Sequence, residues 1–85
     1  MNAQDLINEA ADRNLTVEVM SDGIVDYYGT NMSEAYDAIE GVEEAEVTFY
    51  EDGDIIGWAL ILIDLDEDEQ IADCSGWVNV VTEVR

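Results

Sequence analysis

Apolar residues recur along the chain with two different spacings, and each spacing predicts a different kind of element. Between residues 2 and 13 they fall three or four positions apart, which is typical of one face of a helix. Asn2 and Asp5 are placed to cap its start, and Asn14 favours its end. The predicted inner face consists of Leu6, Ile7, Ala10 and Ala11.

Period-two alternation follows directly. Residues 15–20 place apolar side chains at every second position, which predicts a half-buried strand. The turn residues at 21–23 and the run at 24–28 predict a second strand, joined to the first as a hairpin. The inward positions of the first strand are Leu15, Val17 and Val19.

Helical spacing returns at residues 30–41. Asn31, followed three positions later by Glu34, forms a capping pattern, and Gly41 favours the end of the helix. The predicted inner stripe is Met32, Ala35, Tyr36 and Ile39, and the outer face carries Glu34, Asp37 and Glu40.

The next segment is rich in strand signals. Residues 44–51 alternate, and the Asp-Gly pair at 52–53 is a strong hairpin signal. The strand after it, residues 55–63, is apolar at nearly every position, which predicts a place inside the sheet with both faces at least partly covered. The inward positions of the first of these strands are Ala45, Val47 and Phe49.

The C-terminal residues fit two kinds of element. Residues 70–74 have the pattern of a short strand, and Ser75 is placed to cap a final helix, although the valines that follow also suit a strand. The helical alternative places on one face Trp77, Val80, Val81 and Val84. The order of elements predicts an α+β fold for residues 1–85: a small single domain with a mostly antiparallel 4–5-stranded sheet, packed with two or three helices.

The charge of the chain is its most unusual property. Its 85 residues carry 22 carboxylates against two basic residues, with no lysine and no histidine, so the formal charge is −20. Because 48% of the residues are hydrophobic, the chain is not a disordered acidic tail, and we expect a folded domain with an acidic surface. Solubility requires a net charge of only about 2–8, so the excess charge calls for another cause.

The residue types present exclude most catalytic chemistry. Without histidine or lysine, no Ser-His, Cys-His or Ser-Lys nucleophile pair can form, and the chain has no Gly-rich phosphate loop. One cysteine and no histidine are far from a zinc ligand set. We therefore expect no enzyme activity, no catalytic residue, no cofactor and no metal site.

The acidic run after the apolar strand matches a calcium loop only in part. Asp64, Asp66 and Asp68 occupy the first, third and fifth positions of an EF-hand-like loop. Glu69, however, replaces the required glycine, and Ser75 replaces the closing glutamate. We interpret the run as a solvated hairpin loop whose charges protect the aggregation-prone strand before it.

The chain shows no sign of export or of a membrane segment. Cys74 has no partner for an internal disulfide, and the first residues lack the pattern of a signal peptide. No apolar run reaches the roughly 20 residues that span a bilayer, and an anionic membrane surface would repel the protein. We expect a cytoplasmic location, in the host cell if the chain is phage-encoded.

The spacing of the carboxylates indicates what they bind. On strands, alternate residues lie about 6.5–7 Å apart, and on helices, residues three or four apart lie about 5–6 Å apart, a step comparable to that of phosphates on DNA. Such an array would enter the basic DNA-binding groove of a host protein, and its charge would keep it from binding nucleic acid itself. The predicted partner-binding residues are Glu18, Asp26, Glu34, Asp37, Glu40, Glu43, Glu44 and Glu46.

Within this set, the stretch from Glu34 to Glu46 holds the densest charge and is expected to face the partner as one cluster. Aromatic side chains between the carboxylates are candidates for specific contacts, although tyrosine on a strand is also common at the edge of a core. These tyrosines are Tyr27, Tyr28 and Tyr50.

Parts of the chain resemble the phage uracil-DNA glycosylase inhibitors. The similarity lies in the strand WALILID at 58–64 with its acidic turn, and in the N-terminal helix, the strand LTVEV and the helix SEAYDAIEG. That family consists of acidic α/β DNA mimics, so the resemblance implies an enzyme inhibitor with Glu18 and Glu34 nearest the enzyme. It also implies a pocket lined by Met32, Tyr36 and Ile39. More loosely, the chain is similar to the small acidic phage proteins among anti-CRISPR and anti-restriction inhibitors.

The leading interpretation is thus a DNA-mimic inhibitor of a CRISPR effector, a restriction enzyme or a uracil-DNA glycosylase. Two others stay open: an acidic binding partner of a basic protein that does not act on nucleic acid, and an ordinary domain of a halophile whose acidity serves solvation. The sequence predicts no oligomeric state.

Overall fold

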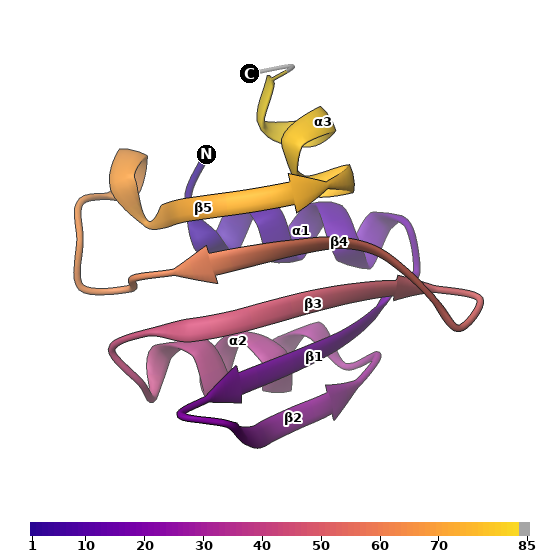
Figure 1. Ribbon diagram of the computed structural model, residues 1–85, viewed down its shortest axis with the longest axis horizontal. Helices are drawn as coiled ribbons and strands as arrows, with labels where there is room; N and C mark the ends of the chain where they lie inside the picture. Colours follow the sequence, from indigo (N-terminus) through magenta and orange to yellow (C-terminus); the bar gives the residue numbers. More distant parts are fainter. Residues whose placement is uncertain (84–85) are drawn as a thin grey trace.

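In the computed structural model, which describes residues 1–83, one sheet lies against a layer of helices (Figure 1). The α-helices in this range are α1 (Ala3–Asp12), α2 (Met32–Glu40) and α3 (Trp77–Glu83). The strands are β1 (Thr16–Ser21), β2 (Ile24–Gly29), β3 (Ala45–Glu51), β4 (Asp54–Ile61) and β5 (Ile71–Gly76), with a 3-10 turn η1 at Glu67–Glu69. The predicted α+β fold of a small single domain is confirmed.

Local side-chain bonds fix the starts of the first two helices, as predicted. At α1, Asn2 accepts a hydrogen bond of 2.8 Å from the backbone N–H of Asp5, whose carboxylate accepts one from the backbone N–H of Asn2. At α2, Asn31 accepts a bond of 3.1 Å from the N–H of Glu34, and Gly41 follows the last turn. These caps satisfy N–H groups that a helix start leaves without partners.

The sheet has the strand order β2-β1-β3-β4-β5, and every neighbouring pair within residues 1–83 is antiparallel. Two hairpin turns have the predicted Asp-Gly sequence, Asp22-Gly23 and Asp52-Gly53, and all four of these residues have positive φ. Positive φ at both central positions matches the right-handed twist of the flanking strands. Helix α2 connects β2 to β3 and carries the chain to the other side of β1.

The core lies between the sheet and the helices. The strand positions predicted to point inward are fully buried: Leu15, Val17, Val19, Ala45, Val47 and Phe49. Helices α1 and α2 bring Leu6, Ile7, Ala35 and Ile39 against them. One predicted position of α1 is wrong, because Ala11 is exposed and Ala3 is buried in the first turn.

Helix α3 confirms the helical alternative for the C-terminal segment but corrects its details. Ser75 is not a cap, because it pairs with Trp58 inside the sheet. Trp77 and Val78 are the buried residues of the helix, and Val80 is 60% exposed instead of facing inward. Val81 is half-buried and packs against the core, in agreement with the prediction. Val84, also predicted for this face, lies outside the described residues.

Close backbone packing places α3 on the same face of the sheet as the other helices. A β-carbon at Gly57 would lie 3.1 Å from the backbone nitrogen of Trp77 and 3.2 Å from that of Val78. Gly76 turns the chain into the helix with a φ of +64°, and a β-carbon there would collide with the carbonyl oxygen of Ile56. Within residues 1–83, all α-helices therefore cover one face of the sheet.

Candidate functional site

The other face of the sheet carries no helix of the described chain, and Figure 1 views the molecule from this side, with α1 and α2 behind the strands. Alternate residues of each strand point to this side, and the strand register aligns them in rows across the sheet. We call this surface the open face. It comprises Thr16, Glu18, Met20, Val25, Tyr28, Glu46, Thr48, Tyr50, Ile55, Trp58, Leu60, Asp73 and Ser75.

Strand β4 shows why the sequence did not reveal this face. The strand lies between β3 and β5, as predicted, and Ala59 and Ile61 are buried under the helices. Trp58 and Leu60 point to the open face, where only side chains of the sheet itself flank them, and both are half-buried. The prediction that both faces of this strand are at least partly covered agrees with these exposures, but apolar residues on both sides hide which face carries the helices.

Glu18 lies on the open face between two tyrosines. The Tyr50 hydroxyl donates a long hydrogen bond of 3.4 Å to Oε1 of Glu18, and the Tyr28 and Tyr50 rings make an edge contact with centroids 5.9 Å apart. Burial, followed by the charge and hydrogen bond of Glu18, raises the pKa of Tyr50 above its ordinary 10.0. Tyr50 therefore stays protonated and keeps donating to the carboxylate at neutral pH.

The three candidate tyrosines divide between the two faces. Tyr28 and Tyr50 lie on the open face, and Tyr28 is 60% exposed. Tyr27 packs against the core instead, and its hydroxyl accepts a hydrogen bond of 2.8 Å from the backbone N–H of Asn31 at the start of α2. Of the three, Tyr27 has the structural role.

Glu46 belongs to a second row of the open face. Its neighbours across the strands are Met20 on β1 and Leu60 on β4, and Leu60 in turn faces Asp73 on β5. Glu46 and Asp73 are exposed, while Met20 and Leu60 are half-buried. Carboxylates and apolar side chains thus alternate along this row at the spacing of neighbouring strands, about 4.7–4.9 Å.

The carboxylates predicted on the second helix lie on the opposite side of the molecule. Ala35 and Ile39 face the core, so Glu34, Asp37 and Glu40 are exposed on the outer side of α2. The structure therefore does not bring the stretch from residue 34 to residue 46 onto one surface, because the sheet separates the α2 carboxylates from Glu46.

The remaining predicted partner-binding residues lie in a connection and on an edge strand of the sheet. Glu43 and Glu44 are exposed in the connection between α2 and β3. Asp26 is exposed on the edge strand β2 and accepts a hydrogen bond of 2.6 Å from the hydroxyl of Ser21. Of the eight predicted partner-binding residues, only Glu18 and Glu46 belong to the open face as defined above.

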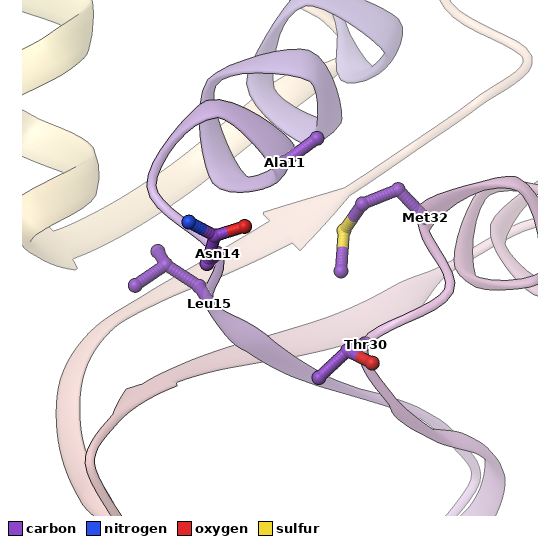
Figure 2. Close-up of a pocket in the computed structure, with 5 residues that line it drawn as sticks. All are labelled: Ala11, Asn14, Leu15, Thr30 and Met32. Carbon is purple, nitrogen blue, oxygen red and sulfur yellow. The ribbon is translucent and has the colours of Figure 1, made fainter.

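The pockets on the helical side include two that lie between α1 and α2. The larger, of ≈ 480 Å³, is lined by the uncharged residues Ala11, Asn14, Leu15, Thr30 and Met32 (Figure 2). Figure 2 shows the Met32 side chain extending from α2 towards the end of α1. A second pocket of ≈ 270 Å³ between the same helices is lined by Gln4, Ile7, Asn8, Met32, Ser33, Tyr36 and Asp37. Of the pocket residues implied by the resemblance, Met32 and Tyr36 line this pocket, whereas Ile39 is fully buried.

The acidic loop after β4 is tied to the fold through Gln70. The side chain of Gln70 accepts a hydrogen bond of 2.9 Å from the backbone N–H of Ala3 and donates one of 3.2 Å to the carbonyl of Ile63. Within residues 1–83, no three His, Cys, Asp or Glu side chains are grouped so that they could hold a metal ion. The two hydrogen bonds of Gln70 support a structural interpretation of this loop.

Comparison with protein families, with curated proteins and with solved structures finds no match to this chain. In the described part of the chain, no helix is both long enough and apolar enough to cross a membrane. The function must therefore be argued from the surface itself.

Proposed function

We propose that the protein is an acidic DNA mimic that occupies the basic DNA-binding groove of a host nucleic-acid enzyme, as a phage inhibitor of host defence or DNA processing. The observation that carries the proposal is the exposure of its charge. The formal charge is −20, and within residues 1–82 no charged side chain is buried. Carboxylates that the fold leaves at the surface are available to a cationic partner.

Internal neutralisation of this charge is weak. Arg13, one of only two basic residues, bonds Glu51 at 2.9 Å and lies 5.6 Å from the centre of the Trp77 ring. The Arg13 and Glu51 side chains are 43% and 42% exposed, so solvent screens the pair and it contributes little to stability. The arginine serves to hold α1 against α3 and leaves most carboxylates without a counter-charge.

The fold supports mimicry because it presents charge from regular elements. Helix α2 carries carboxylates one turn apart, and the open face carries them on neighbouring strands. A mimic of this kind is steered into a basic groove by its field and releases bound counterions there, as DNA does. The candidate targets are a CRISPR effector, a restriction enzyme and a uracil-DNA glycosylase.

The proposal is tested by displacement of a labelled DNA duplex from one purified enzyme of each candidate class. We expect the protein to displace the duplex from at least one of them, less effectively as salt rises, and to bind no DNA or RNA itself. Unfolded poly-glutamate of similar charge is the control, and it should displace much less DNA at equal charge concentration. A ternary complex of enzyme, duplex and protein would contradict mimicry.

The same experiment separates the two alternatives. A partner that binds the protein without losing DNA would favour a basic protein whose function does not involve nucleic acid. A protein that folds only at high salt and displaces no DNA would favour the halophile interpretation.

A further inference from the structure

Apolar side chains are exposed on the strands but not on the outer side of α2. The exposed large apolar residues of the described chain include Val25 and Tyr28 on β2, which are 49% and 60% exposed, and Ile55 on β4, which is 66% exposed. Val25 pairs with Met20 and Ile55 pairs with Tyr50, so these side chains continue into the half-buried residues of the open face. The open face is therefore partly apolar, unlike a simple polyanion.

Each carboxylate of the open face has apolar or aromatic neighbours across the strands. Glu18 lies next to Tyr28, and Glu46 lies between Met20 and Leu60. Asp73 borders Leu60 from the edge strand. This arrangement suits a partner that brings a positive charge and an apolar surface to the same place.

We propose that the open face is the docking surface of the protein, and that its occupant is a protein surface on which arginines alternate with apolar side chains. The inference rests on the proposed function, because such a surface would belong to the basic groove. Arginine fits better than lysine, since a guanidinium can bond a carboxylate through two N–H groups and also stack on an aromatic ring. Glu18 offers the carboxylate, and the neighbouring Tyr28 offers an aromatic ring for stacking. Trp58 offers a second ring in the same row of the sheet, on the far side of Thr48 from Glu18.

A second copy of the chain fits this surface poorly. Two open faces packed together would bring Glu18, Glu46 and Asp73 of each copy into one poorly solvated layer, and none of the residues that form the open face is basic. Like charges that meet at an interface cost several kcal/mol. Charge complementarity therefore selects a cationic occupant.

Binding is tested by NMR titration with a short synthetic peptide of alternating arginine and leucine. We expect the two tryptophans to give separate indole N–H signals, because Trp77, at the start of α3, is only 7% exposed and Trp58 is half-buried on the open face. We expect the Trp58 indole and the amides of β1 and β3 to shift, while the Trp77 indole stays in place. A peptide with serine in place of leucine, with the same charge, should bind about tenfold more weakly.

A matched pair of variants locates the surface. Glu18→Gln with Glu46→Gln removes two charges from the open face, and Glu34→Gln with Asp37→Asn removes two from the outer side of α2. The first variant should weaken peptide binding about tenfold, and the second by less than about twofold, because its charges are distant and screened. Circular dichroism verifies that both remain folded.

Three results would overturn the proposal: equal weakening by both variants, shifts confined to α2, and a dimer in sedimentation that Trp58→Ala dissociates. The two proposals fail separately. If the protein displaces duplex but only the α2 variant loses that ability, mimicry stands and the open face is the wrong surface. If the protein displaces no duplex while the peptide binds the open face, the docking surface stands and mimicry fails.

Discussion

On the open face, Tyr50 is a residue whose pKa changes on folding. The pKa of Tyr50 is raised in the fold by burial and by Glu18, and burial, with Glu40 and Glu67, raises that of Tyr36. A tyrosine whose folded pKa lies above its unfolded value contributes stability below the unfolded pKa. That stability is lost as the pH rises through the folded pKa.

We predict that the melting temperature falls as the pH rises above the ordinary tyrosine pKa of 10.0, and that Tyr50→Phe makes this fall shallower, because phenylalanine has no proton to lose. The dependence of the melting temperature on pH is measured by thermal unfolding at several pH values, monitored by circular dichroism. Glu18→Gln should also make the fall shallower, and combining the two should add little, because both act through the same contact. An unchanged slope in Tyr50→Phe would refute this account.

Among the elements, helix α3 depends on one close approach to the sheet. Gly57→Ala would place a methyl group against the backbone nitrogens of Trp77 and Val78, which cannot rotate away. We predict a loss of about 1–3 kcal/mol, measured by urea unfolding, as α3 moves off the core.

Gly41→Ala is the matched control for that substitution. Gly41 has a φ of −77°, and a β-carbon there would meet its nearest atoms at an ordinary 3.5 Å. Alanine at this position should be neutral or stabilising by about 0.4–1 kcal/mol, since it restricts the unfolded chain. Equal losses at Gly41 and Gly57 would mean that the packing of α3 is not the cause.

Elements with clear end signals were predictable from the sequence, and elements without them were less so. The caps at Asn2 and Asn31 and the two Asp-Gly turns fixed most boundaries because each acts locally. The C-terminal helix was ambiguous because its valines also suit a strand, and its inner face was misplaced by the assumption of a cap at Ser75. How α3 lies depends on tertiary contacts such as the close approach at Gly57.

For the molecule as a whole, the carboxylates were predictable as a surface property, but their division between two sides was not. The outward positions of α2 follow from helical periodicity. Which face of the sheet stays open depends on where the helices pack, and the all-apolar pattern of β4 concealed it. The pairing of Glu18 with Tyr28 and Tyr50 likewise needs the strand register, which joins residues distant in sequence.

At the same scale, we predict that the melting temperature rises with salt. At about 0.01 M salt the Debye length is near 30 Å and the carboxylates repel one another across the molecule, whereas at about 0.15 M it is near 8 Å. A gain of about 1 kcal/mol would raise the melting temperature by roughly 4–8 °C. In a variant with amides in place of the carboxylates of Glu34, Asp37, Glu40 and Glu43, the melting temperature should rise less with salt. A melting temperature of the wild type that does not change with salt would contradict the picture of unbalanced charge.

The placement of every α-helix of residues 1–83 on one side of the sheet also has a consequence for how such a chain can change over evolutionary time. Along β3, the residues that fill the core, such as Val47 and Phe49, alternate with those that meet the outside, such as Glu46 and Thr48. Mutations at the outward positions can accumulate without disturbing the core. A lineage of this protein could therefore acquire a new target by drift at every second strand position, while the intervening positions keep the fold.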